Sequence, residues 1–356
     1  MAGITPGDIA NAERILVSVR DEWLDRPGVV AVDLGFKWSK GEMTTELSIR
    51  VHVVDKKPAS QLSDEEIFPE EIGGISVDVI EAFYVPQALS NSKLESAVDG
   101  RDKRYEVIPV GVSIGSRYST AGTLGAKVID IKTGDEMILS NWHVLAGRTG
   151  ARPGLPIWQP GWIDGGTRED NTIAELSRWI LGPLDAAVAK INGAREVTTK
   201  TLEGRSIEDV TEPRLGMRIW KSGRSTGYTE GFIDGIKMRV SIPYGELGVK
   251  RIDYVFHVVP RPGADRTEIS MGGDSGAVWV DDESGKAVGL HFAGERANLP
   301  EHALANEIIQ VTKALNVRFP GQSPPKTAKL PIPRRMSNTA LFDALTKFLR
   351  RLFRTR

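Results

Sequence analysis

Ser275 is the side chain of this sequence best placed to act as a nucleophile. It stands in the tetrapeptide Gly273-Asp274-Ser275-Gly276, directly before the apolar run 277–280. Glycines on both sides of a serine allow a tight turn, in which two backbone N–H groups can point at one place beside the hydroxyl. An oxyanion formed during acyl transfer would be stabilised at that place. The motif therefore indicates acyl-transfer chemistry.

A serine hydroxyl becomes a good nucleophile only when a neighbouring base accepts its proton, and histidine is the usual base. His143 follows the strand-like stretch 136–139, and Asp185 opens the apolar run 186–189. A buried aspartate there would hold the imidazole in one tautomer and stabilise the imidazolium. The other histidines lack such a context, and the sequence has no paired His/Cys spacing of the kind that binds zinc. We therefore expect a reaction with neither a metal nor another cofactor.

The three residues follow one another in the order His143, Asp185, Ser275, which is the order found in chymotrypsin. On these motifs, the stretch from about 107 to 316 resembles bacterial serine peptidases of the trypsin/chymotrypsin type. The resemblance implies a mainly β fold, in which two six-stranded antiparallel barrels hold the site between them. It also implies that His143, Asp185 and Ser275 are catalytic. By the same resemblance, the N–H groups of Gly273 and Ser275 form the oxyanion hole.

Three further residues are predicted to bind the substrate side chain that precedes the cleaved bond: Ile269, Ser270 and His291. An isoleucine where trypsin carries an aspartate offers no counter-charge to lysine or arginine. The string Gly-Leu-His-Phe-Ala-Gly around His291 resembles that of glutamyl endopeptidases, in which a histidine and a serine or threonine hold a carboxylate, and Ser270 stands at the matching position. An acidic preference and a small or apolar preference both stay open, and so does a purely structural role for His291.

The aspartate before the nucleophile poses a separate question. In the family that the chain resembles, a freshly cut N-terminus pairs with this aspartate, here Asp274. The sequence has no Ile-Val-Gly-Gly start, and a whole predicted domain precedes the barrels. We therefore expect that the site is preformed or that another contact orders the loop.

The first part of the chain predicts a small α+β domain. Apolar residues over 8–24 recur at helical spacing, and Asp8 is placed to cap the start of that helix. Alternating patterns over 29–36 and 46–54 predict a hairpin, and 75–82 predicts a third strand. Similar small domains precede the peptidase in some bacterial trypsin-like proteins and, more loosely, in plant narrow-leaf type proteases.

Polar and Pro-rich stretches then divide the chain. The C-terminal basic amphipathic helix would dock on this protein or a sister subunit, seat in a partner's groove, or lie on an anionic membrane. The predicted parts are an α+β domain over 1–86, a linker over 87–106, the peptidase domain over 107–318, a Pro-rich linker over 319–336 and the basic helix over 337–356.

Composition limits the classes of partner and compartment. The formal net charge of −1 gives no general attraction to nucleic acid. The chain has no cysteine, and its first 25 residues carry several charges and no continuous apolar core, unlike a signal peptide. These features predict a cytoplasmic, bacterial protein.

Together the patterns predict a serine endopeptidase that hydrolyses protein or peptide substrates, as a regulated processing protease. The alternative is a catalytically latent protein of the trypsin fold, which binds or scaffolds and needs a partner for activation. An esterase using the same chemistry is a third hypothesis. A homo-oligomer or a protein partner would assemble through the C-terminal helix or the N-terminal domain.

Overall fold

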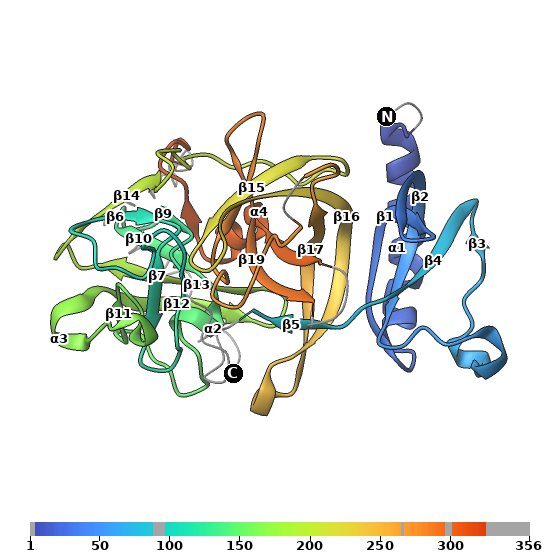
Figure 1. Cartoon of the computed structure of the whole chain (residues 1–356), viewed down its shortest axis with the longest axis horizontal. Helices are drawn as coiled ribbons and strands as arrows, with labels where there is room; N and C mark the ends of the chain where they lie inside the picture. Colours follow the sequence, from blue (N-terminus) through green and yellow to red (C-terminus); the bar gives the residue numbers. More distant parts are fainter. Residues whose placement is uncertain (1–3, 88–96, 265–266, 296–300, 325–356) are drawn as a thin grey trace, which may run out of the picture. The chain divides into compact units, whose positions relative to one another are not determined.

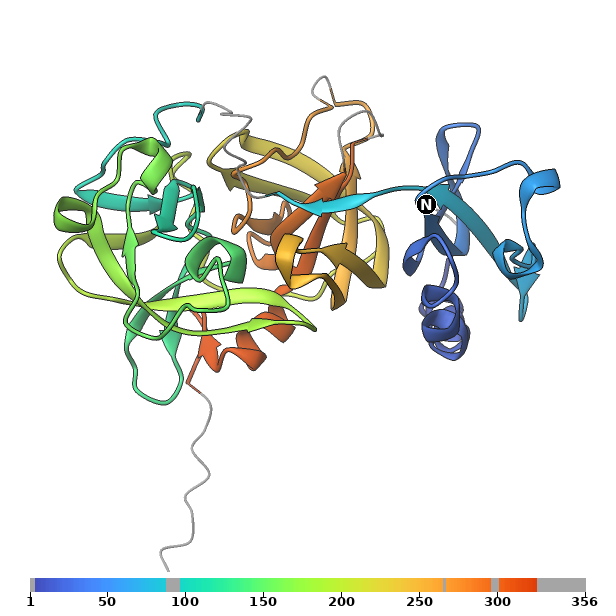
Figure 2. The same cartoon turned by 90° about the horizontal axis from the view of Figure 1, so that it is seen from below.

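The computed structural model describes residues 4–87, 97–264, 267–295 and 301–324 (Figure 1). Antiparallel strands dominate, and they form two curled sheets (Figures 1 and 2). The chain separates into two units, 1–322 and 323–356, and the predicted basic helix over 337–356 lies outside the described residues. The predicted mainly β fold, with a helix-and-sheet region before it, is confirmed.

The first curled sheet carries His143 and Asp185. It has eight strands in the order β21-β9-β10-β13-β12-β11-β7-β8, and β6 pairs with β14 in parallel beside it. The strands are β6 (Val107–Val110), β7 (Ser113–Ser116), β8 (Gly122–Thr123), β9 (Ala126–Asp130), β10 (Glu136–Ser140), β11 (Pro156–Trp158), β12 (Thr172–Leu181), β13 (Asp185–Ile191), β14 (Glu196–Thr201) and β21 (Val317–Arg318).

The second sheet carries Ser275 and His291 and runs on into the N-terminal strands. Its order is β15-β18-β19-β20-β17-β16-β1-β2-β4-β3, with β5 added at β19. It exceeds the expected six strands because β1 pairs antiparallel with β16. The strands are β1 (Val29–Ser39), β2 (Glu42–Val53), β3 (Glu71–Ile72), β4 (Ile75–Glu81), β5 (Tyr84–Pro86), β15 (Arg218–Gly223), β16 (Gly227–Pro243), β17 (Val249–Pro260), β18 (Val278–Asp281), β19 (Ala287–Glu295) and β20 (Ala303–Glu307).

The predicted N-terminal helix is α1 (Pro6–Leu24), and its apolar face packs on β1, β2 and β16. The expectation that Asp8 caps this helix is corrected. Thr5 is the capping residue: its hydroxyl oxygen accepts from the N–H of Asp8 over 3.2 Å, and the Asp8 carboxylate accepts from the N–H of Thr5 over 2.8 Å. Pro6 explains the earlier start, because proline is favoured in the first helical turn, where its missing N–H costs nothing.

A buried ion network lies where β1 and β2 meet β16. The guanidinium of Arg50 donates to Asp33 over 2.8 Å and to Asp234 over 2.6 Å, and all three side chains are fully buried. Burial alone would raise the pKa values of the two carboxyls. The positive charge of Arg50 opposes burial and lowers the pKa of Asp33 to about 2. The hydrogen bonds therefore cross from the N-terminal strands into the second sheet. The predicted domain boundaries stay a prediction.

Three further helices are short: α2 (Trp142–Leu145), α3 (Arg168–Asn171) and α4 (Ile308–Ala314). α2 packs against β13 and β7, and so fixes the position of His143 on the first sheet. Among the residues with described positions, no helix combines the length and the apolar character needed to cross a membrane.

Candidate active site

His143 and Asp185 are brought together by neighbouring strands. Asp185 is the first residue of β13, and His143 lies in the first turn of α2, just after β10, which pairs with β13. Nδ1 of His143 lies 2.5 Å from Oδ2 of Asp185, and the N–H of Trp142 donates to Oδ1 over 2.7 Å. The Asp185 side chain is fully buried. The carboxylate thus orients the ring and leaves Nε2 free for proton transfer.

Tyr244 is a further partner of the aspartate, and no motif in the sequence indicates it. Its hydroxyl donates to Oδ2 of Asp185 over 2.6 Å. Burial and the nearby Asp185 charge raise the pKa of Tyr244 well above its usual value, so the phenol keeps its proton. Asp185 is therefore hydrogen-bonded to both a histidine ring and a phenol, which fixes the position of its carboxyl group.

Ser275 sits on the turn that the glycines predicted. Gly273 and Gly276 have φ values of 99° and 95°, a region that favours glycine. The Ser275 hydroxyl is fully buried and donates to the carbonyl oxygen of Phe292 over 3.4 Å. Within the described residues, Nε2 of His143 has no hydrogen-bond partner. The histidine and aspartate are therefore joined, while the serine hydroxyl is bonded elsewhere.

Asp274 is held by a lysine from β15. Nζ of Lys221 lies 3.1 Å from Oδ2 of Asp274, and both side chains are fully buried. Thr226 donates its hydroxyl to the same oxygen over 2.6 Å, and the N–H of Ser225 donates to Oδ1 over 2.8 Å. Lys221 is thus a buried charged partner of Asp274 in the turn that carries Ser275. In the sequence, this contact is indicated by a lysine that directly follows the apolar residues of a strand.

The predicted pocket residues occupy one wall of the second sheet. His291 is fully buried in β19, and burial lowers its pKa to about 3, so the ring is neutral at physiological pH. Ile269 is buried in the apolar core. The Ser270 hydroxyl is also buried and has no hydrogen-bond partner in the described part of the chain. The side chain that does contact His291 is Gln87, with Oε1 2.6 Å from Nε2.

A carboxylate that the sequence analysis missed supports this wall. Oε1 of Glu301 accepts the N–H groups of Ile269 and Ser270, each over 2.9 Å. Burial, followed by the charge of Glu295, raises the pKa of Glu301 to about 8. The two carboxyls share a half-buried environment, so one proton between them relieves their repulsion.

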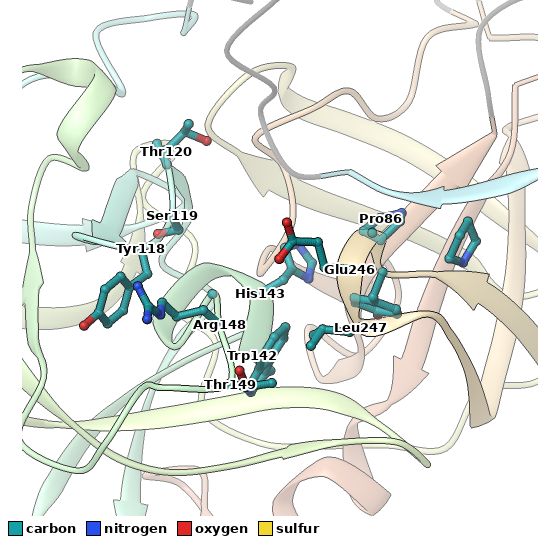
Figure 3. A pocket seen from close by; sticks show the side chains of 15 residues that line it. Pro86, Tyr118, Ser119, Thr120, Trp142, His143, Arg148, Thr149, Glu246 and Leu247 are labelled. Carbon is teal, nitrogen blue, oxygen red and sulfur yellow. The ribbon is translucent and has the colours of Figure 1, made fainter.

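An open cleft of about 780 Å³ lies in front of the histidine (Figure 3). His143, Trp142 and Tyr244 form its inner part, Pro86 lines one side, and Arg148 contributes a charge. The cleft therefore reaches the side chain of His143, whose Nε2 atom is itself buried. Ser275 does not line it.

The N–H of Gly273 already holds a peptide carbonyl. It donates over 2.9 Å to the main-chain oxygen of Gln87, a residue of the predicted linker. This N–H is one of the two that the resemblance assigned to the oxyanion hole. The donor therefore binds a carbonyl oxygen, which Gln87 supplies in this structure.

Comparisons with known proteins point to one class of fold. No family model matches the chain, and no curated protein matches it. Solved structures that are similar to it are serine proteases.

Three of these structures illustrate the likeness. Nocardiopsis protease is 15% identical over 60% of this chain and 98% of its own, with a TM-score of 0.45. A glutamic acid-specific serine protease, described as using a histidine triad in substrate binding, is 15% identical over 60% of this chain and 100% of its own, with a TM-score of 0.45. Cellulomonas bogoriensis chymotrypsin is 16% identical over 60% and 97%, with a TM-score of 0.43.

Proposed function

We propose that this chain is a serine endopeptidase that hydrolyses peptide bonds through an acyl-enzyme. Ser275 attacks the substrate carbonyl carbon while Nε2 of His143 takes the hydroxyl proton. Asp185, bonded to Nδ1, stabilises the imidazolium that forms. The N–H groups of Gly273 and Ser275 bind the oxyanion.

Three proton transfers through His143 complete the reaction. The C–N bond breaks as His143 gives its proton to the leaving amine. Water then attacks the ester while His143 takes the water proton, and the acyl–Ser275 bond breaks as His143 returns that proton to the serine oxygen, which releases a carboxylic acid. No step needs a cofactor. The observation that carries the proposal is the Gly273 N–H, which holds a peptide carbonyl oxygen at 2.9 Å beside a fully buried serine.

One observation favours the second candidate, a latent protein of this fold that binds or scaffolds until a partner activates it. The Ser275 hydroxyl donates to Phe292 rather than to His143. The enzyme needs this hydroxyl to turn to Nε2 of His143, whose ring Asp185 already holds and whose Nε2 is without a partner in the described residues. We therefore favour the enzyme. The cytoplasmic and bacterial assignments stay predictions from composition.

Labelling by a fluorophosphonate probe tests the proposal, because the probe reacts only with an activated serine. Three full-length proteins are compared: wild type, Ser275→Ala, and Gln87→Gly, which removes the side chain bonded to His291. We expect Gln87→Gly to label at least as fast as wild type, and Ser275→Ala not at all. Labelling of neither wild type nor Gln87→Gly would favour the latent protein.

A further inference from the structure

The segment Tyr84–Gln87 lies in the predicted site as an added strand. β5 pairs antiparallel with the end of β19, with Tyr84 opposite Glu295 and Pro86 opposite Ala293 (cyan in Figure 2). The N–H of the next residue, Gln87, donates to the carbonyl oxygen of Phe292 over 3.2 Å. The main chain thus follows the strand edge toward Ser275. Strand addition to a sheet edge is a common way to bind extended peptides.

Gln87 is held in place through both its side chain and its main chain. Its side-chain oxygen lies 2.6 Å from Nε2 of His291, and its main-chain oxygen accepts the Gly273 N–H over 2.9 Å. The residue is only 7% exposed. A Cβ at Gly294 would fall 2.0 Å from the Gln87 side-chain nitrogen, so the glycine is needed for the fit. The surroundings of Gln87 therefore form a built pocket rather than a chance contact.

This placement has a chemical consequence. A carbonyl oxygen on the Gly273 N–H places the carbonyl carbon of the same residue beside the nucleophile turn, where Ser275 would attack. We propose that the chain is its own substrate, and that Ser275 cleaves the peptide bond on the carboxyl side of Gln87. This inference rests on the proposed endopeptidase function.

The cleavage balances as an acyl transfer followed by hydrolysis. The Ser275 oxygen bonds to the Gln87 carbonyl carbon, and the C–N bond to residue 88 breaks. His143 carries the serine proton to the new amine, and water then releases Gln87 as a free carboxylate. The products are the fragments 1–87 and 88–356.

The pocket chemistry favours a glutamine over a glutamate. A neutral histidine donates one hydrogen bond from Nε2 to an amide oxygen without needing a counter-charge. A carboxylate in the same place would be buried without a free cation of its own, because the nearby Lys221 is already paired with Asp274. We therefore expect a preference for glutamine at the residue before the cleaved bond, in this chain and in other substrates.

The cut chain should stay together. Tyr84 is buried, and its hydroxyl lies 2.9 Å from Nδ1 of His52. β1 remains paired with β16 through contacts that the cut does not touch. The two fragments should therefore elute as one species under native conditions and separate only in denaturant.

Intact-mass measurement on full-length protein tests the proposal. Wild type, Ser275→Ala, Gln87→Ala and the matched control Gln61→Ala, an exposed glutamine, are purified and incubated in parallel. We expect wild type and Gln61→Ala to yield 1–87 and 88–356, and Ser275→Ala to stay intact. Gln87→Ala should be cut at least tenfold more slowly. Because the segment is bound within its own chain, the rate constant should not change over a hundredfold dilution.

The outcomes separate this inference from the proposed function. Fluorophosphonate labelling of Gln87→Gly together with an uncut wild type would overturn self-cleavage and leave the endopeptidase standing. Cleavage elsewhere, or a rate that rises in proportion to protein concentration, would also overturn it. Absence of both labelling and cleavage would remove the endopeptidase itself.

Discussion

At the scale of single residues, two buried donors stand out because each holds a carboxylate of the candidate site. Tyr244 holds Asp185 through its hydroxyl, and Lys221 holds Asp274 through its ammonium group. A buried carboxylate without such partners would lose its charge or move toward water. Both contacts therefore hold a carboxyl group of the candidate site in place, one beside His143 and one next to Ser275.

The Tyr244 hydroxyl can be tested without disturbing its ring. Tyr244→Phe should slow fluorophosphonate labelling about tenfold, because a hydrogen bond to a charged group contributes ~1.5–3 kcal/mol, part of it in the transition state. The rate constant for labelling is measured on the Gln87→Gly background. Tyr105→Phe, whose hydroxyl bonds a distant carbonyl, should label at the unchanged rate. An undiminished rate in Tyr244→Phe would mean that Asp185 does not need the phenol.

The candidate site could be predicted only in part from the sequence. Ser275, His143 and Asp185 are visible because each stands in a short motif with strand-like neighbours. Tyr244 and Gln87 carry no such signal, since their roles depend on pairings between segments far apart in the chain: Tyr244 follows β16 directly, and Gln87 follows β5. A local sequence pattern indicates whether a segment forms a helix or a strand, but it does not indicate which segment lies next to it in the fold.

At the scale of elements, the join between β1 and β16 is the feature that the sequence could not reveal. The hairpin β1–β2 and the helix α1 follow from their apolar periods, and the structure has both. Side chains from separate segments of the chain determine which strand the hairpin pairs with. Arg50 on β2 lies between Asp33 on β1 and Asp234 on β16, so three strands must be in register before the charges are neutralised.

Removing that arginine should destabilise the fold strongly. Arg50→Met removes the guanidinium that two buried carboxylates share, and we expect the free energy of unfolding to fall by ~3–5 kcal/mol. Urea denaturation followed by tryptophan fluorescence measures the change. Arg251→Met removes an exposed ion pair with Asp25 and should cost less than ~1 kcal/mol. Adding Asp33→Asn and Asp234→Asn to Arg50→Met should recover part of the loss; no recovery would contradict the charge argument.

At the scale of the whole molecule, the Glu295–Glu301 pair links pH to stability. The pKa of Glu301 is about 8 in the folded chain against an ordinary value of 4.5. Between these values the folded state binds more protons than the unfolded state, so stability falls as pH rises and levels off above about 8. The wall formed by Ile269 and Ser270 depends on the same carboxyl.

Glu301→Gln should flatten this dependence. A neutral amide keeps an acceptor oxygen for the two N–H groups and has no proton to lose. Because the pair is partly exposed, we expect wild type to lose ~1–3 kcal/mol more than the variant between about pH 5 and pH 8.5. Urea denaturation at a series of pH values gives the two curves. Glu246→Gln, a solvent-exposed carboxyl, should follow wild type, and parallel curves for Glu301→Gln would refute the assignment.

The strand β5 gives the molecule a property that ordinary inhibitors lack. A segment joined to its own catalytic sheet has an effective concentration fixed by geometry, commonly in the millimolar range or above. Diluting the protein leaves that concentration unchanged, so occupancy of the β19 edge by β5 does not depend on protein concentration. A peptide that binds the β19 edge must compete against β5, and a force or ligand that draws the N-terminal strands away would free this edge without altering His143, Asp185 or Ser275.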